Sequence, residues 1–541
     1  MSGCYRGTHD LAGSGDDSGT DAGSEDEGES PTDGDDAQCV EGPWLAPQTR
    51  RLSHDEYRNT LVDLFAPIEL PALTLVEDAA PLGFDNTASA LRVNALLVEQ
   101  YETAATNVAE AAVASLDVLL PCEADDRSCP QQFIREFGAR AFRRPLSEDD
   151  EALYLEFFES RDPDIDFAGR VQLVVAAMLQ SPYFLYRAEL GQAGPDGELR
   201  ATDYEVASRM SYLLWQSMPD DALFAAAAAG ELSDPDRRRE IAVEMLAAAR
   251  APAAVGSFHR QWLELDALEL KPKDPTTFPD FDEDVRASMG LELRSFIDYV
   301  VFDGEGTLAA LLTDPHATLD ARTASIYGVT VPDDGMMHAV DLDPGQRAGV
   351  LTRAAFLATH AYPRSSSPPR RGKFVIERLL CSELPPPPGD ADLTPPEPAP
   401  GTKTNRELFE EKTAEPHCSG CHQALHGIGF GFEHYDAIGQ YQVLDSGLPV
   451  DASGQLLGSD VDGPFEGAVE LSQRLATSED VEACMTRQWF RFAYGRAETS
   501  EDECRIEQLH RRLDEADGSI QTLLLDIIAS DDFTRVSQGD P

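Results

Sequence analysis

The chain is poor in positive charge. Its 541 residues include 43 Lys and Arg against 98 Asp and Glu, which gives a formal net charge of −55 at pH 7 with His neutral. Nucleic acids and anionic membrane surfaces repel such a protein, so both are excluded as partners of most of its surface. A redox partner protein with a basic surface would be attracted instead, although solubility alone is the simpler explanation of the acidity.

Positive charge is missing altogether between Arg6 and Arg50, where Asp, Glu, Gly and Ser dominate. Such a segment cannot bury enough apolar surface to fold, so we expect residues 1–44 to form a disordered acidic tether. The opening Met-Ser-Gly-Cys is similar to the end of a bacterial lipobox. We therefore expect Cys4 to carry a lipid anchor. The alternative is a plain disordered tail with an incidental cysteine.

Long apolar runs and strand patterns are scarce as well. A membrane helix needs about 18 consecutive apolar residues, and the alanine-rich stretch 223–230 is far shorter. Alternation typical of strands is limited to one short pair near 441–450. Signatures of a Ser/His/Asp triad, a phosphate-binding loop or a dinucleotide fold do not stand out. The sequence therefore offers no support for the enzyme classes that these motifs mark.

What the sequence has in abundance is helical periodicity. Ser53 and Glu56 form a capping box ahead of apolar residues at helix spacing, and Thr202 with Glu205 forms another. Prolines between 385 and 400 predict an extended, semi-rigid strap that separates a large helical body from a C-terminal module. We expect a mainly α protein. Other helices are predicted at 91–120, 282–301, 345–360, 478–494, 500–515 and 519–529, and from Ser147 and Pro235 onward. The stretch 171–186 is mostly apolar, and we expect it to be buried.

The nine cysteines predict a disulfide framework and an oxidising, extracytoplasmic compartment. Cys122 and Cys129 bracket a short polar loop and form the first expected pair. Cys484 and Cys504 lie on consecutive predicted helices and form the second. Cys39 and Cys381 remain, either bonded to each other or free.

The motif with the most specific chemistry is Cys418-Ser-Gly-Cys421-His422, which has the spacing of c-type haem attachment. Two thiols three positions apart on one helical turn can reach the two vinyl groups at a porphyrin edge. The adjacent histidine then projects its imidazole under the iron. We expect one covalently attached haem c, with His422 as the proximal iron ligand.

Three other interpretations fit this motif less well. A structural zinc site would need a fourth ligand, such as His417 or His426, and usually a second paired motif, which the sequence lacks. A thioredoxin-like redox pair would lie beside a βαβ pattern, which is also lacking. A plain disulfide between the two cysteines leaves the adjacent histidine without a role.

The ligand on the far side of the iron is less determined, since methionine or histidine favours electron transfer and an open position favours catalysis. We rank His360 first as distal ligand because its segment leads directly into the haem motif. His426 is the less favoured candidate, since it shares a helix face with His422. Arg370 and Arg371 are expected near the haem propionates, or else to pair with surface carboxylates. Further candidates for the iron are Met336, Met337, His434 and Met485.

With these residues noted, the chain resembles a family of exported multi-domain proteins of planctomycetes and myxobacteria. Its parts are the domains of unknown function 1587, 1595, 1592, 1588 and 1585. The resemblance implies an extracytoplasmic, redox-active mono-haem protein. The motifs that carry it are RLSHDEYRNTLVDLF at 51–65, AFRRPL at 141–146, QSPYFLYR at 180–187, SRMSYLLWQSMPDD at 208–221, RGKFVIERLLC at 371–381, GFGFEHYDAIG at 429–439, WFRFAYGR at 489–496 and SDDF at 530–533.

The resemblance also implies a division into segments. It has two departures: family members often have histidine where Lys412 stands, and Asp-Pro where His426 and Gly427 stand. The first removes one possible iron ligand and the second adds another. The expected segments are the tether at 1–44, helical domains at 45–120, 121–190 and 191–335, a segment with the strap and haem motif at 336–445, and a C-terminal helical domain at 446–541.

These observations together predict an extracytoplasmic mono-haem c-type cytochrome-like protein that transfers electrons. It would be anchored through Cys4 in the periplasm or at the outer membrane. A haem-dependent oxidase, peroxidase or dehydrogenase is the alternative from another class, although diheme peroxidases need two attachment motifs. A cell-envelope binding scaffold is the third possibility. Whether the protein is an enzyme is left open.

Overall fold

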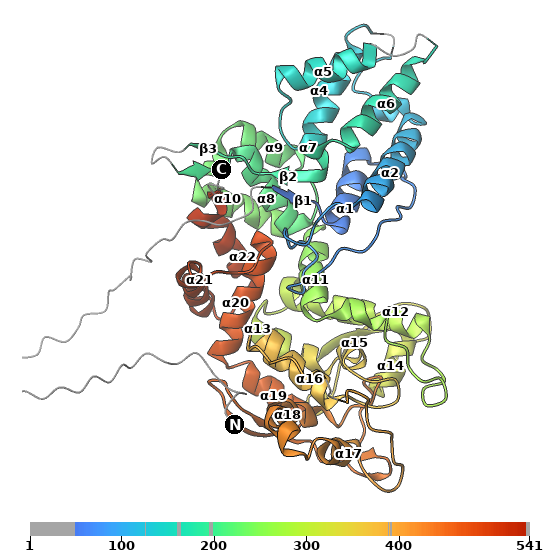
Figure 1. Cartoon of the computed structure of the whole chain (residues 1–541), viewed down its shortest axis with the longest axis vertical. Helices are drawn as coiled ribbons and strands as arrows, with labels where there is room; N and C mark the ends of the chain where they lie inside the picture. The colour runs from blue at the N-terminus through green and yellow to red at the C-terminus, as the bar shows by residue number, and fades with distance from the viewer. Residues whose placement is uncertain are drawn as a thin grey trace, which may run out of the picture.

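A computed structural model describes residues 49–536 except 125, 160–163, 194–197, 388, 390 and 391; the side chains of residues 416–419 and 421 also lie outside the description. The described residues form twenty-two α-helices and five two-stranded antiparallel sheets. The expected mainly α fold is therefore confirmed. Figure 1 shows an elongated molecule with α4 (Cys129–Phe142), α5 (Glu148–Glu159) and α6 (Phe167–Leu179) at one end and α17 (Asn405–Lys412) and α18 (Pro416–Gly429) at the other.

The N-terminal part packs around its own hydrophobic core, which includes Tyr57, Phe133 and Val174. Ser53 caps the first helix and both halves of the predicted capping box with Glu56 are present. The elements are β1 (Thr49–Arg51), α1 (His54–Phe65), α2 (Ala95–Val113), α3 (Leu116–Leu119), α4 (Cys129–Phe142), α5 (Glu148–Glu159), α6 (Phe167–Leu179), α7 (Pro182–Leu185) and β2 (Tyr186–Ala188), with β1 paired to β2.

The middle part begins with a second capping box, formed by Thr202 and Glu205 as predicted. Its elements are β3 (Gln192–Ala193), β4 (Leu199–Arg200), α8 (Asp203–Trp215), α9 (Asp221–Ala228), η1 (Glu231–Ser233), α10 (Pro235–Leu246), α11 (Ala251–Trp262), η2 (Leu265–Leu268), α12 (Glu283–Asp298), η3 (Tyr299–Asp303), α13 (Leu308–Thr313), β5 (His316–Leu319), α14 (Ala321–Tyr327) and β6 (His338–Asp341).

The C-terminal part carries the cysteine motif on α18. Its elements are η4 (Val350–Thr352), α15 (Ala354–Thr359), α16 (Pro368–Phe374), η5 (Val375–Leu379), α17 (Asn405–Lys412), α18 (Pro416–Gly429), η6 (Phe430–Phe432), β7 (Leu444–Asp445), β8 (Leu448–Pro449), β9 (Ser453–Leu456), β10 (Gly463–Glu466), α19 (Gly467–Leu475), α20 (Glu479–Tyr494), α21 (Glu503–Glu515), α22 (Ile520–Ala529) and η7 (Asp531–Thr534). The strand pair β7–β8 lies where the sequence predicted one.

Some predicted helix lengths were wrong. The stretch 91–120 forms α2 and the short α3, because Ala114 and Ser115 leave the helix between them. The stretch 345–360 contains only the short η4 and α15. Gly349, with a φ of 53°, interrupts the second stretch, and Asn94 caps α2 after the predicted start of the first.

One hydrophobic core joins the middle and C-terminal parts. Helix α22, near the C-terminus, packs on α10, and Figure 1 shows the two helices in the same part of the molecule. The buried Arg238 of α10 donates hydrogen bonds to the carbonyls of Ile528, Ala529 and Ser530. The same core also includes Ile428 of the motif helix. The parts of the chain on either side of the proline-rich strap therefore share one core.

The described disulfides differ from the prediction in one pair. Cys122 and Cys129 are bonded, as expected, with Cα atoms 5.5 Å apart. Cys484, however, is bonded to Cys381, so the predicted pairing with Cys504 is wrong. The reason is that α20 packs against η5, which brings the buried Cys484 to the end of that element. Cys504 is itself disulfide-bonded.

Among the described residues, no single helix has both the length and the apolar composition to cross a membrane. Helices α10 and α11 pass the same test only as a pair, and they meet at an angle of 89°. Cys4 and Cys39, for which a lipid anchor and a disulfide were considered, lie outside the described residues.

Candidate functional site

Helix α18 carries the whole cysteine–histidine motif on one continuous stretch of helical backbone. Pro416 stands in its first turn, where a fixed φ and a missing N–H are favourable. Residues 418, 421 and 422 are separated by three and four positions, so they share one face of this helix. The side chains of Cys418, Cys421 and His417 lie outside the described residues, so haem attachment stays a prediction.

His422 contacts His426 one turn further along the same helix. Nδ1 of His422 lies 3.0 Å from Nε2 of His426 at hydrogen-bond distance. The rings are 4.6 Å apart between centroids. Two imidazoles in contact on one helix face cannot bind opposite sides of one iron, so His426 is not the distal ligand. The contact occupies Nδ1 of His422 and leaves Nε2 as the nitrogen for a metal.

Both histidines are held in the neutral form. Burial lowers the pKa of the half-buried His422 below its usual value. Burial, together with the neighbouring His422, lowers the pKa of His426 to about 3. A neutral imidazole has the free lone pair that metal binding requires.

Aromatic rings surround the histidine pair. Phe409 of α17 and Phe430 of η6 lie 5.7 and 5.1 Å from the ring of His426. Tyr362 stacks on Phe409, with ring centroids 6.2 Å apart. These rings make an apolar environment in which a ligand's flat, apolar face would be stabilised.

Glycines allow the backbone of neighbouring elements to contact α18. A Cβ on Gly372 of α16 would lie 1.9 Å from the carbonyl oxygen of Leu425, and one on Gly429 would lie 2.0 Å from the carbonyl of Pro368. On the other side, a Cβ on Gly427 would lie 2.8 Å from the carbonyl of Gln455 in β9. The motif helix is therefore clamped between α16 and β9, because no side chain keeps the backbones apart.

The two arginines predicted near the propionates have different surroundings. Arg371 is fully buried and donates hydrogen bonds to four backbone carbonyls, those of Leu357, Phe432, Tyr435 and Asp436. Its two terminal nitrogens hold the chain after α18 against α15, so its predicted role at the haem is wrong. Arg370 is half-buried, donates to the carbonyl of Ala361 and lies over the ring of Tyr362 at 4.3 Å. Its role at the propionates stays a prediction.

His360 is enclosed in the core. Its ring packs between Phe356 and Phe374, at 4.7 and 4.9 Å between centroids. Nε2 lies 3.3 Å from the carbonyl oxygen of Leu263, and burial lowers the pKa to about 4. A ring enclosed in this way has a structural role, and the prediction that it is the distal ligand is wrong. The prediction from chain continuity failed because α15, which ends just before His360, packs against η2 and α12.

Two other candidates for the iron have partners of their own. Nδ1 of His434 lies 2.9 Å from the carbonyl of Gln442, and its ring stacks on Tyr441. Met485 is buried in α20. Lys412, where relatives often have histidine, donates to the carboxylate of Asp392 in the strap at 2.8 Å. The lysine that stands where relatives often have histidine therefore ties α17 to the strap.

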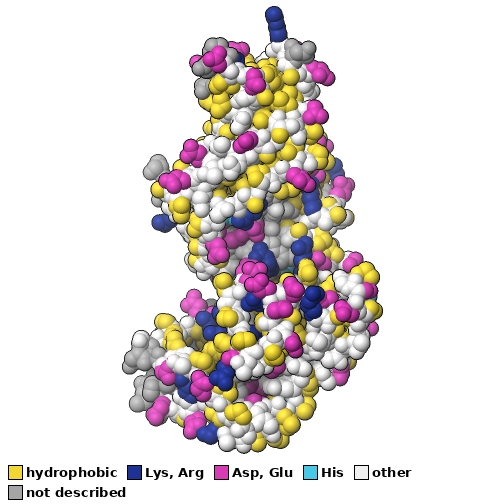
Figure 2. All heavy atoms as spheres, turned by 90° about the vertical axis from the view of Figure 1, so that its right-hand side faces the viewer, with side chains coloured by type: hydrophobic (Ala, Val, Ile, Leu, Met, Phe, Trp, Pro, Cys, Tyr) yellow, Lys and Arg dark blue, Asp and Glu magenta, His cyan; other side chains and the backbone are white. Residues whose placement is uncertain are grey.

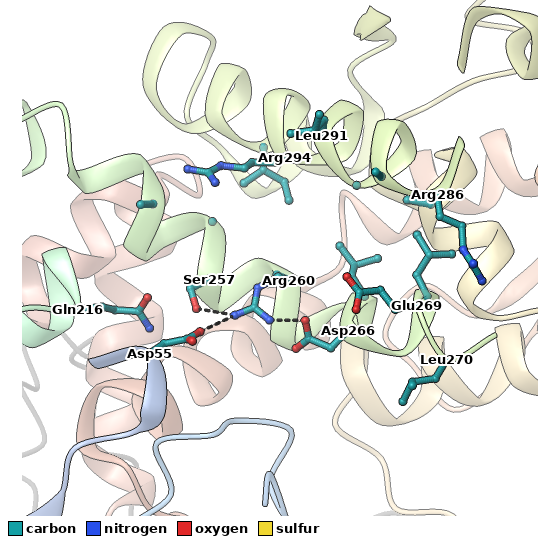
Figure 3. Close-up of a pocket in the computed structure, with 18 of the residues that line it drawn as sticks. Asp55, Gln216, Ser257, Arg260, Asp266, Glu269, Leu270, Arg286, Leu291 and Arg294 are labelled. Atoms are coloured by element: carbon teal, nitrogen blue, oxygen red, sulfur yellow. Dashed lines mark hydrogen bonds and ion pairs between the residues drawn. The ribbon is translucent and has the colours of Figure 1, made fainter. Parts of the chain in front are cut away.

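A large cleft lies elsewhere, at the waist of the molecule. It has a volume of about 1060 Å³ and runs between α1, α11 and α12, visible as a hollow in Figure 2. Figure 3 shows Arg260 between Asp55, at 3.1 Å, and Asp266, while Arg294 lies on the opposite wall. None of the described lining residues belongs to α18. The sequence did not predict this cleft, because its walls come from segments far apart in the chain.

The charges in the cleft are largely paired. Besides the ion pairs of Arg260, Arg286 lies 3.9 Å from Glu283 and Arg294 lies 3.7 Å from Asp298. The lining holds four carboxylates and three arginines, so neither sign of charge dominates the walls. The residues with the most specific chemistry therefore lie on α18 and not in the cleft.

Comparison with known protein families agrees with the order of the quoted motifs. Five family models match in succession, all described as proteins of unknown function: DUF1587 at residues 50–114, DUF1595 at 129–189, DUF1592 at 201–329, DUF1588 at 347–445 and DUF1585 at 462–533. The chain is built from these five families of domains. No curated protein and no solved structure matches it.

The DUF1588 domain includes most of the candidate site. Its range begins before α15 and ends in β7, so it holds the histidine pair, the aromatic rings around it and α16. The second clamping element, β9, follows that range. The site thus lies mostly within one domain of the five, and one of its walls comes from the residues between this domain and the next.

Proposed function

We propose that the protein is an extracytoplasmic mono-haem c-type cytochrome-like protein that transfers electrons. The observation that carries the proposal is the pairing of His422 with His426 on the helix of the Cys418–Cys421 motif. A metal-bound histidine commonly donates its other ring N–H to a nearby acceptor, which fixes its tautomer and orientation. The described residues fit a haem here, since this acceptor is already in place.

Each residue of the site has a distinct role in this proposal. Cys418 and Cys421 hold the haem through thioether bonds, and His422 presents Nε2 to the iron. When bound, the haem supplies one-electron iron chemistry. The clamp of α16 and β9 on α18 keeps the ligand helix fixed, so that little protein rearrangement accompanies a change of charge.

The remaining parts of the proposal concern partners and location. The net charge of −55 favours a redox partner with a basic surface. A lipid anchor at Cys4 would place the protein in the periplasm or at the outer membrane, and the disulfides agree with an oxidising compartment.

Covalent haem is tested by expression with a cytochrome c maturation system. We expect haem-dependent peroxidase staining to remain after denaturing electrophoresis, because thioether bonds survive denaturation. The double variant C418A/C421A should lose the stain. The matched control C122A/C129A removes two cysteines at the other end of the molecule and should keep it. A wild-type haem that extracts into acidified organic solvent contradicts the proposal.

The optical spectrum then separates electron transfer from catalysis. A six-coordinate, low-spin haem supports electron transfer, since both axial positions are then filled by the protein. A high-spin haem with an open position would instead favour the haem-dependent oxidoreductase.

A further inference from the structure

We propose that His426 is a positioning residue that accepts a hydrogen bond from Nδ1–H of His422 and thereby lowers the reduction potential of the haem. This inference rests on the proposed function. It goes beyond it by assigning a role to a histidine outside the attachment motif.

The direction of the hydrogen bond follows from the chemistry of imidazole. A neutral imidazole has one N–H and one lone pair. If Nε2 of His422 gives its lone pair to iron, Nδ1 must carry the proton. The atom 3.0 Å from Nδ1 is Nε2 of His426, which must then accept. His426 consequently carries its own proton on Nδ1, so haem ligation determines the tautomers of both rings.

His426 is also held where it can act as a fixed acceptor. Only 5% of its surface is exposed. Phe409 and Phe430 pack against its ring, and the next residue, Gly427, is pressed against the backbone of β9. With α16 in contact on the other side of the helix, the imidazole has little freedom to turn away from His422.

The electronic consequence is specific. A hydrogen bond accepted from the ligand's N–H raises the electron density on the ligand, which favours the ferric over the ferrous iron. Removing the acceptor should therefore favour reduction. A tenfold change in the equilibrium constant for reduction corresponds to about 59 mV for a one-electron couple. We expect a positive shift of about this size.

The experiment compares His426→Leu, which fills the apolar surroundings without an acceptor, with His426→Gln, which retains an acceptor oxygen. Redox titration should show a positive shift for His426→Leu and a value near that of the wild type for His426→Gln. His434→Leu, a histidine in the same domain with other partners, serves as the control and should leave the potential unchanged. Equal potentials for the wild type and His426→Leu would overturn the inference.

A measurement on the wild type alone decides the same question if the leucine variant does not fold. In nitrogen-15 spectra of histidine-labelled holoprotein, Nε2 of His426 should be unprotonated and Nδ1 of both rings protonated. The opposite assignment for His426 would overturn the inference. A wild type that carries no covalent haem overturns the proposed function itself, which distinguishes the two failures.

Discussion

Gly372 and Leu425 are in direct backbone contact: a Cβ on Gly372 would lie 1.9 Å from the carbonyl oxygen of Leu425. This contact joins α16 to the helix of the cysteine motif. It means that the position of His422 depends on a helix that starts more than fifty positions earlier in the chain. The site is therefore a product of tertiary packing, although its motif is local.

Gly372→Ala should destabilise the protein by about 1–3 kcal/mol or more, because the added methyl group would force α16 and α18 apart. Gly290→Ala is the matched control: it lies inside α12 with open space around it and should stabilise by about 0.5–1 kcal/mol. The measurement is the free energy of unfolding in urea. Equal stability of Gly372→Ala and the wild type would contradict the contact.

Removal of the Cys381–Cys484 disulfide should cost more stability than removal of Cys122–Cys129. The two bonds close loops with sequence separations of 103 and 7. In the chain-entropy account these loops correspond to about 4.7 and about 2.5 kcal/mol. Thermal unfolding of C381S/C484S and C122S/C129S measures the difference. A larger loss in the second variant would show that chain entropy does not govern these bonds.

Asp85 should make stability depend on pH. Burial, followed by repulsion from Glu56 and Asp55, raises the pKa of its carboxyl to about 7, and Oδ1 is buried without a partner. The folded state therefore keeps a proton that the unfolded state has lost, and stability falls as pH rises from about 4 to about 7.

Asp85→Asn removes this titration and should be more stable than the wild type above pH 7, by up to about 1.4 kcal/mol for each unit of pKa difference. At pH 4, where the carboxyl is protonated, the two proteins should be nearly equal in stability. The measurement is the free energy of unfolding between pH 4 and 8. Parallel curves for the two proteins would show that Asp85 does not titrate in this range.

Arg371 and its neighbour Arg370 should respond differently to the same substitution. Arg371→Lys should cost at least about 2 kcal/mol, since one ammonium cannot reach four carbonyls and a buried acceptor left unpaired costs about 1–3 kcal/mol. Arg370→Lys should cost about 1 kcal/mol or less, because Arg370 is only half-buried. Denaturant unfolding of both variants measures the contrast. Equal losses would contradict the structural role assigned to Arg371.

Local features were predictable from the sequence. The capping boxes Ser53–Glu56 and Thr202–Glu205 and the disulfide Cys122–Cys129 all join residues within one turn or one short loop. The spacing of His422 and His426 belongs here too, because residues four positions apart on a helix are neighbours. Interactions of this kind depend only on backbone geometry that the residues themselves specify.

The sequence by itself therefore determined the mainly α class, the five domain families and the motif on one helix face. Only the tertiary structure decided that Cys484 forms a disulfide with Cys381, that Arg371 donates hydrogen bonds to backbone carbonyls and that His360 lies in the core. These outcomes depend on which distant helices pack together. Which helices pack together is determined by the burial of their whole apolar faces. The residue pattern of a single segment is therefore not enough to predict it.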